Sequence, residues 1–160
     1  MFGFLKKKKQ QIIIGSPVKG YAVGLKEVPD PTFRDEMIGK GAAVIPSEGK
    51  IYAPADGTIS MVFDTLHAIS MLSDNGAEIL IHVGLDTVAL KGDGFQGYVK
   101  AGDVVKKGDL LLTADLEKIK QAGYSPITPV LICNPDAYEI STITEKEVLP
   151  GEALIEANEI

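Results

Sequence analysis

Short runs of apolar, β-favouring residues alternate with turn signals rich in Gly, Pro, Asn and Asp from Ile12 to the end of the chain. Strand-length runs at this spacing are typical of antiparallel sandwiches and barrels. The predicted strands are 12–14, 20–25, 42–46, 49–54, 57–63, 65–72, 77–84, 86–90, 95–99, 103–105, 109–113, 128–133, 138–141 and 153–155. The pattern therefore predicts an all-β fold, an antiparallel β-sandwich or barrel.

Helical signals are few. Residues 115–122 begin with Asp115 as an N-cap, carry apolar residues on one side and stop at Gly123, as a short helix does. A helical turn or loop is predicted for 32–38, after two prolines. The fold should thus contain one or two short helices.

Two segments, 52–59 and 101–110, are similar to each other. The pair resembles the lipoyl and biotinyl carriers and other barrel-sandwich hybrids, in which a modifiable lysine lies at a turn between two such segments. No Met-Lys-Met sequence occurs here. The resemblance therefore supports a barrel-sandwich hybrid-like architecture and not the swinging-arm function.

Both histidines of the chain, His67 and His82, lie in the arms of a hairpin predicted around Asn75-Gly76, a strong hairpin signal. With either Asn75-Gly76 or Asp74-Asn75 as a two-residue loop, the two imidazoles share one face, within about 4.5–8 Å at Cβ. This prediction depends on an even-length loop, because a slip of one residue sends the rings to opposite faces.

Facing imidazoles permit several kinds of chemistry. A zinc site needs three or four protein ligands, and Glu78 is the nearest candidate in the same strand. A general acid–base pair usually needs a nucleophile and an oxyanion hole, and no Gly-flanked serine elbow is present. In a covalent phosphocarrier, one imidazole attacks a phosphoryl group and its neighbour donates a hydrogen bond to the phosphoryl oxygens. The remaining interpretation is that both are structural residues of the sheet.

The length of 160 residues fits one domain, predicted for 12–160. The net charge of −6 and the pI of about 4.9 argue against nucleic acid and favour a basic protein partner. The single cysteine, Cys133, excludes an internal disulfide and is expected to be a small buried apolar residue.

Residues 1–11 are predicted to form a flexible basic tail outside the domain. Phe2, Phe4 and Leu5 come before four lysines, which is the reverse of the order in a secretory signal. Such a tail is either mobile in solvent or makes peripheral contact with an anionic membrane surface. No stretch is long enough to span a membrane, so we expect a cytoplasmic location.

The run from Ile81 to Phe95 closely resembles the phosphorylation signature of the glucose-type IIA component of the bacterial sugar phosphotransferase system. Shorter matches follow in family order, at 28–33, 37–41, 53–57, 65–69 and 128–130. The resemblance covers nearly the whole chain from about Ile12. It places the protein among phosphocarriers.

The resemblance also implies roles for individual residues. His82 would accept the phosphoryl group through Nε2, His67 would stabilise it, and Thr65 would orient His67. Gly84 matches the small residue beside the phosphorylated histidine. The partner-binding residues would be acidic ones suited to arginines on a basic carrier, Asp30 and Asp86, and an apolar patch of Phe33, Ile38, Phe63, Leu80 and Val88. For Phe63 and Ile38 the alternative is a place in the core.

The implied function is to accept a phosphoryl group from the histidine-containing phosphocarrier protein and to pass it to a sugar-specific IIB domain of a permease. No cofactor is required, although a carboxylate from a regulated transporter or enzyme can complete a zinc site with His67 and His82. The alternative is a non-catalytic regulatory or metal-binding module on the same fold.

Overall fold

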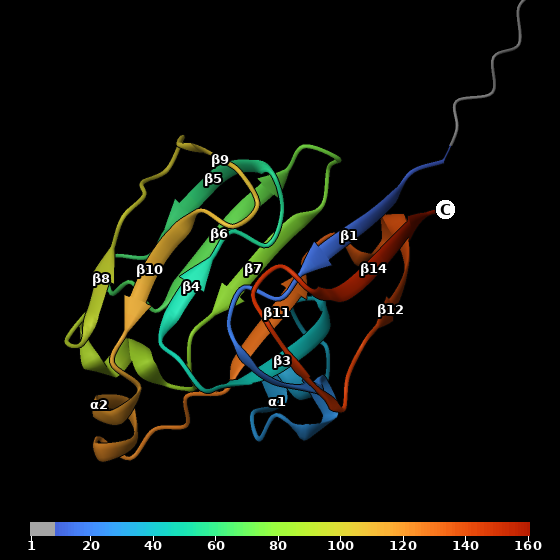
Figure 1. Cartoon of the computed structure of the whole chain (residues 1–160). Coiled ribbons are helices and arrows are strands. Elements are labelled where there is room, and N and C mark those ends of the chain that lie inside the picture. Colours follow the sequence, from blue (N-terminus) through green and yellow to red (C-terminus); the bar gives the residue numbers. More distant parts are fainter. Residues whose placement is uncertain (1–8) are drawn as a thin grey trace, which may run out of the picture.

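The structure, a computed structural model, describes residues 9–160 and is built mainly of antiparallel strands (Figure 1). Its strands are β1 Gln11–Gly15, β2 Gly20–Gly24, β3 Lys40–Pro46, β4 Lys50–Tyr52, β5 Gly57–Val62, β6 Ala68–Ser73, β7 Glu78–His82, β8 Phe95–Gly97, β9 Val104–Val105, β10 Leu110–Ala114, β11 Thr128–Ile132, β12 Tyr138–Thr142, β13 Lys146–Val148 and β14 Ala153–Glu159. The predicted all-β sandwich class is confirmed.

The strands of the described residues form three sheets. The largest has eight strands in the order β13-β2-β3-β11-β7-β6-β5-β9, and two smaller sheets have the orders β4-β10-β8 and β1-β14-β12. The two similar segments 52–59 and 101–110 lie side by side, because β5 pairs with β9 and β4 pairs with β10. This pairing agrees with the predicted barrel-sandwich hybrid-like architecture.

Two α-helices, α1 Pro31–Arg34 and α2 Leu116–Gln121, and three 3₁₀ turns, η1 Leu25–Glu27, η2 Thr87–Leu90 and η3 Pro135–Ala137, complete the described part. The Asp115 carboxylate caps α2 by accepting from the Lys118 N–H at 3.1 Å, as predicted. Helix α1 is shorter than the predicted turn at 32–38. None of the described helices has the length and apolar character needed to cross a membrane.

One predicted strand is wrong. Residues 86–90 were expected to be extended, but 87–90 form η2. The reason lies just before it, where Gly84 and Asp86 have φ angles of +81° and +60° and turn the chain out of the sheet. The short, polar strand β13 was not predicted, because it has little of the alternation that marks a half-buried strand.

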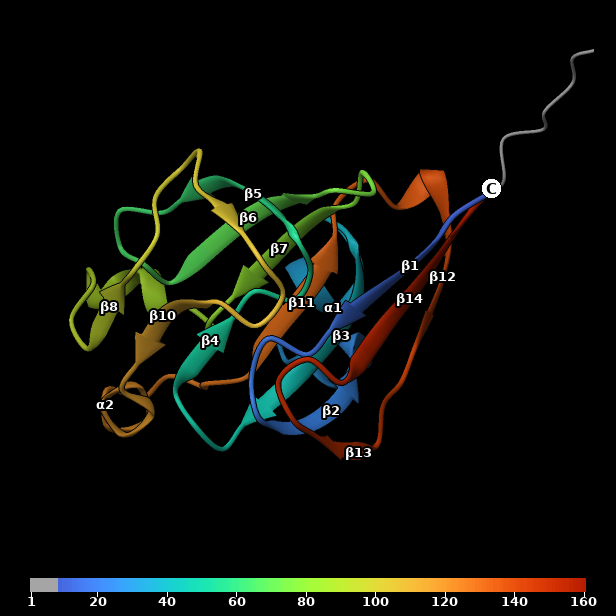
Figure 2. The same cartoon turned by 45° about the horizontal axis from the view of Figure 1, so that its top comes forward.

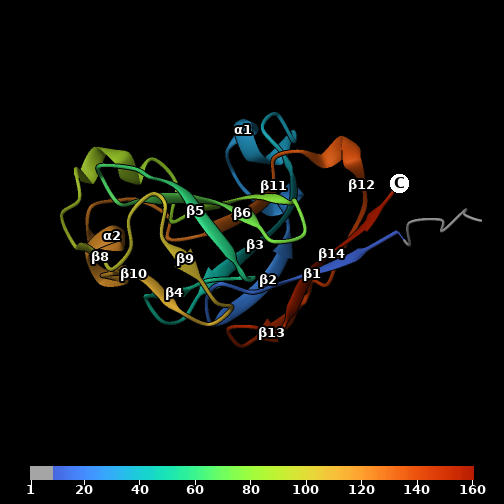
Figure 3. The same ribbon diagram turned by 90° about the horizontal axis from the view of Figure 1, so that it is seen from above.

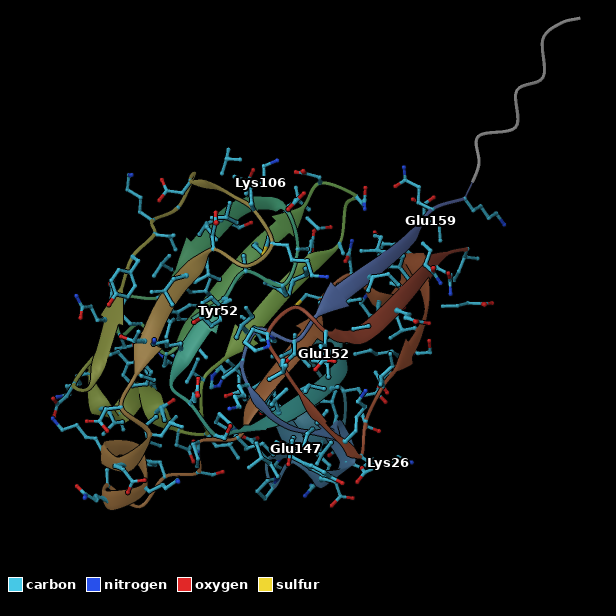
Figure 4. The ribbon with its side chains drawn as sticks, viewed as in Figure 1. Lys26, Tyr52, Lys106, Glu147, Glu152 and Glu159 are labelled. Carbon is cyan, nitrogen blue, oxygen red and sulfur yellow. The ribbon has the colours of Figure 1, made fainter. Side chains whose placement is uncertain are left out.

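The main core lies between the sheets. Its largest fully buried side chains are Ile12, Ile14, Ile51, Ile59, Ile69, Met71, Ile79, Ile81, Leu111, Leu112 and Ile119. Charged side chains such as Lys26, Lys106 and Glu147 lie on the outside (Figure 4). The interior is therefore apolar, as the alternation along the strands requires.

A second, smaller cluster lies on the other face of the large sheet. Val130 and Ile132 of β11 belong to the main core, whereas Leu131 between them points to this second cluster. Phe33 of α1 also packs into it. The helix is thus held against the outer face of the large sheet, next to β7.

Cys133 is exposed, so the prediction of a buried cysteine is wrong. β11 ends at Ile132, and all five residues of that strand are buried. Cys133 continues the apolar run in the sequence, but it follows the strand and lies outside the core.

The first described residues and the C-terminal strand run side by side (Figure 2). Gln11, which the sequence analysis assigned to the tail, pairs with Asn158 as the first residue of β1, and the Glu159 N–H donates to the Gln10 carbonyl. The Phe2, Phe4 and Leu5 cluster lies outside the described residues.

The β6–β7 hairpin has a register that differs from the prediction. Ala68 pairs with His82 and Leu72 with Glu78, and the Ser73 N–H donates to the Ala77 carbonyl. The loop therefore has three residues and ends in Gly76 with φ +97°, a common hairpin loop with glycine in the left-handed region. The even-length loop was wrong.

Candidate active site

The two histidine rings nevertheless meet. Their centroids are 4.9 Å apart and their planes are 82° apart. His82 is the last residue of β7, and His67 lies one residue before β6. Helix α1 and the turn η2 (yellow-green) lie on the same side of strands β6 and β11 (Figure 3). Residues of α1 and of η2 line a hollow beside His82.

The odd register does not separate the rings, because His67 lies outside the regular strand. It follows Leu66, whose φ of +60° is left-handed, and strand alternation fixes side-chain direction only within extended backbone. The backbone of His67 still joins the ladder, since its carbonyl accepts from the Val83 N–H at 2.7 Å. The loop before β6 thus turns the His67 ring toward His82.

The geometry of His82 distinguishes its two ring nitrogens. Nδ1 lies 2.7 Å from the Gly84 carbonyl oxygen, which can only accept, so Nδ1 carries the proton and donates it. Burial lowers the pKa of His82, although the Gly84 hydrogen bond and the carboxylates of Asp30 and Asp86 act in the opposite direction. The ring is therefore neutral near pH 7, and Nε2 keeps a free electron pair.

His67 is only 4% exposed. Its burial, followed by the repulsion from a charged His82, lowers the pKa of His67 to about 4. Nδ1 of His67 lies 2.5 Å from Oγ1 of Thr65. The Phe63 ring packs edge-on at 5.2 Å between centroids. This second imidazole is thus also neutral near pH 7 and is fixed from two sides.

A hollow of about 170 Å³ opens beside His82. It is lined by Asp30, Thr32, Phe33, His82, Asp86 and Val88. Phe33 is buried, and its ring packs against His82 at 4.9 Å between centroids. It forms a wall of the site and is not a protruding contact.

The apolar residues named from the sequence differ in exposure. Val88, Ile38 and Phe63 are exposed, whereas Leu80 is partly buried against the second cluster. Asp30 has a structural task as well, because its carboxylate accepts from the Thr32 N–H at 3.0 Å and caps α1.

One residue that lines the hollow, Thr32, was missed by sequence reasoning. It lies in the segment 28–33 that resembles the family. Its residue type alone gave no chemical signal.

Within residues 9–160, no group of three or more His, Cys, Asp or Glu side chains is arranged to hold a metal ion. His67 and His82 supply two imidazoles, and a closed zinc site needs four ligands. A metal bound there would take its further ligands from another molecule.

Comparison with known proteins shows the family of the chain. The family described as "phosphoenolpyruvate-dependent sugar phosphotransferase system, EIIA 1" matches residues 12–138. The chain is 44% identical over 153 residues to the PTS system glucose-specific EIIA component of Oceanobacillus iheyensis, covering 95% of this chain and 93% of that protein. It is 52% identical over 130 residues to the PTS system glucosamine-specific EIICBA component of Bacillus subtilis, covering 81% of this chain and 21% of that protein.

Among solved structures, the glucose permease IIA from Mycoplasma capricolum is similar with a TM-score of 0.87 and 32% identity, covering 97% of this chain and 99% of that one. The family match, the similar relatives and the similar solved structure lead to one conclusion. The chain belongs to the EIIA 1 family of the phosphoenolpyruvate-dependent sugar phosphotransferase system.

Proposed function

We propose that the protein carries a phosphoryl group on Nε2 of His82, taken from the histidine-containing phosphocarrier protein and delivered to the cysteine of a sugar-specific IIB domain. The observation that carries this proposal is the 2.7 Å contact between His82 Nδ1 and the Gly84 carbonyl. It holds one tautomer, in which Nε2 has the free electron pair.

Each transfer exchanges one bond to phosphorus for another. In the first, the Nε2 electron pair attacks phosphorus while the phosphorus–nitrogen bond of the donor breaks and its electron pair returns to the donor ring. In the second, a thiolate attacks phosphorus and the bond to Nε2 breaks. Because the donor is already activated, positioning supplies most of the catalysis.

His67 stabilises the transferred group in this proposal. The Thr65 hydroxyl lies 2.5 Å from Nδ1 of His67, and when this hydroxyl is the donor, the proton of the neutral ring lies on Nε2. With ring centroids 4.9 Å apart, that N–H can donate to an oxygen of a phosphoryl group on His82. Charge that develops in the transfer is then met by a donor already in place.

The surroundings fit a basic partner that docks through an apolar contact. Asp30 and Asp86 border the hollow, and Val88 at the same rim is 52% exposed. Complementary charge steers such a partner and fixes its orientation. A IIB partner also fits relatives named EIIBCA and EIICBA components, in which the A part shares a chain with B and C parts.

In this proposal, a carboxylate from a regulated transporter or enzyme completes a zinc site with the same two imidazoles. A phosphoryl group on Nε2 of His82 would occupy the ligand position of that site. The alternative of a purely regulatory module has no support from the family match, and labelling tests it.

The test is phosphorylation in solution. The protein is mixed with phosphoenolpyruvate, the general phosphotransferase enzyme and the histidine-containing phosphocarrier protein, and the intact mass is measured. We expect one added phosphoryl group on the wild type and none on His82→Ala. An unmodified wild type would refute the carrier function, and a labelled His82→Ala would refute the assignment of the acceptor.

A further inference from the structure

Thr87 has a buried hydroxyl that the transfer steps above do not use. It is fully buried, begins η2, and its Oγ1 donates to the Val83 carbonyl at 2.5 Å. Asp86, in the N-cap position of η2, makes no side-chain capping bond. The side chain at the start of η2 is therefore tied back to the residue that directly follows His82.

Val83 links this bond to both histidines. Its N–H donates to the His67 carbonyl at 2.7 Å, and its carbonyl accepts from Thr87. It is also the covalent neighbour of His82. The orientation of the Val83 peptide groups therefore sets the backbone position of His82 and of His67.

The methyl group of Thr87 lies beside Gly84, the residue that follows Val83. Gly84 has φ +81°, and a Cβ placed on it would lie 2.5 Å from Cγ2 of Thr87 and 2.9 Å from the carbonyl oxygen of Ser125. That same oxygen accepts from the Leu85 N–H at 2.9 Å. Gly84 is thus enclosed from two sides, and its carbonyl is the one that receives the Nδ1 proton of His82.

We infer that Thr87 is a positioning residue for phosphoryl transfer. Its hydroxyl holds the Val83 carbonyl, so that the adjoining Gly84 carbonyl faces Nδ1 of His82 and Nε2 faces the incoming group; the methyl group fills the space beside Gly84 and is not needed for this positioning. Thr87 is fully buried, so it acts through Val83 and Gly84 and not by direct contact with a partner. The inference deepens the proposed function and rests on it.

Two variants separate the hydroxyl from the shape of the side chain. Thr87→Val keeps the shape and a methyl group but has no hydroxyl, and Thr87→Ser keeps the hydroxyl. We expect Thr87→Val to slow single-turnover phosphoryl acceptance by His82 by about tenfold to a hundredfold, the size expected of a small misplacement of a reacting group. Thr87→Ser should stay within about threefold of the wild type, since the hydroxyl is retained.

The tautomer of His82 can be measured by spectroscopy without any phosphoryl transfer. In ¹⁵N NMR of the imidazoles, the wild type should show His82 in the Nδ1-protonated tautomer, and Thr87→Val should show a mixture of tautomers. This measurement needs no donor. If the wild type is never phosphorylated, the proposed function fails, and the tautomer of His82 in Thr87→Val still decides whether Thr87 positions the ring.

Ser16→Ala is the matched control. The Ser16 hydroxyl is also fully buried and donates to a backbone carbonyl, that of Val18, at 2.7 Å, in the turn after β1. Its loss should lower stability without changing the His82 tautomer or the transfer rate. An unchanged rate and tautomer in Thr87→Val would overturn the inference, and so would equal slowing of Thr87→Val and Ser16→Ala.

If Thr87→Val does not fold, Thr87→Ser decides. A variant that keeps the hydroxyl and yet loses about tenfold or more in rate contradicts a role for that hydroxyl in positioning. A rate near that of the wild type, with the Nδ1-protonated tautomer retained, supports it.

Discussion

At the scale of single residues, the two imidazoles differ through what their Nδ1 atoms contact. A carbonyl oxygen can only accept, so the Gly84 carbonyl places the proton of His82 on Nδ1. A hydroxyl can donate or accept, so Thr65 permits a neutral His67 ring whose proton lies on Nε2. In the proposed function, His82 offers an electron pair and His67 in this tautomer offers a proton.

This division predicts the behaviour of His67→Gln. Since His82 keeps its tautomer, the variant should still accept a phosphoryl group, and onward transfer to the IIB cysteine should fall by about 10²-fold or more because a preorganised donor is lost. Both half-reactions can be followed by rapid-quench kinetics. Normal onward transfer would contradict the role given to His67.

Burial of His67 also predicts a pH dependence of stability. The pKa of His67 is about 4 in the folded protein and about 6.5 in an unfolded chain. As the pH falls below about 6.5, the unfolded state binds a proton that the folded state refuses until about pH 4, so the free energy of unfolding decreases, by up to about 3 kcal/mol.

Above that range the contribution of His67 is constant. Urea denaturation between pH 4 and pH 8 measures the effect, and His67→Gln, which does not titrate, should show a smaller decrease. Equal decreases in the two proteins would show that His67 does not contribute.

At the scale of secondary-structure elements, the three-residue loop between β6 and β7 sets which residues face each other. Gly76 ends that loop with φ +97°, and the nearest atom to a Cβ built on it is the Tyr138 hydroxyl, 3.6 Å away. Space is therefore available, and the backbone conformation alone requires glycine. The loop is a local device that brings the β7 end, with His82, beside the β6 start.

Gly76→Ala should therefore destabilise the protein by about 1–2 kcal/mol, the cost of a left-handed L residue. Gly24→Ala is the control, since a Cβ there meets nothing within 4 Å and the φ of Gly24 is −70°. It should change stability by less than about 1 kcal/mol. Urea midpoints compare the two, and equal losses would show that the φ angle is not the cause.

At the scale of the whole molecule, charge and shape point to the same face. The chain has a net charge of −6, and Asp30 and Asp86 border the hollow at His82. We expect a basic partner to be attracted by the whole protein and to be oriented by these two carboxylates. Val88, Ile38 and Phe63 are exposed, and the proposal assigns them to apolar contact with that partner.

The rate of association with the phosphocarrier protein should therefore fall as ionic strength rises, by about tenfold or more between low and high salt. Asp86→Asn should lower this rate at low salt and weaken its salt dependence. Glu139→Gln, an exposed residue of β12 with the same change in charge, should have a smaller effect. Stopped-flow measurements at several salt concentrations give the association rate of each protein. Identical salt dependence in the wild type, Asp86→Asn and Glu139→Gln would exclude steering by Asp86.

Local patterns predicted most elements because their causes are local. The cap at Asp115 and most strands follow from residues within one element, and these predictions are confirmed. Sequence patterns gave wrong predictions where the conformation of the preceding backbone determined the structure. The positive φ of Gly84 and Asp86 turned an apparent strand into η2, and the end of β11 left Cys133 exposed.

The sequence by itself determined the all-β class, the family and the candidate pair of histidines, since these depend on residue types and their order. Only the tertiary structure decided the hairpin register, the meeting of the rings across an odd-length loop, and the protonated nitrogen of His82. The physical reason is that a tautomer and a ring orientation are fixed by hydrogen-bond partners and packing from several segments. Gly84, Thr87 and Ser125 come together only when η2 and the loop before β11 are folded against the end of β7.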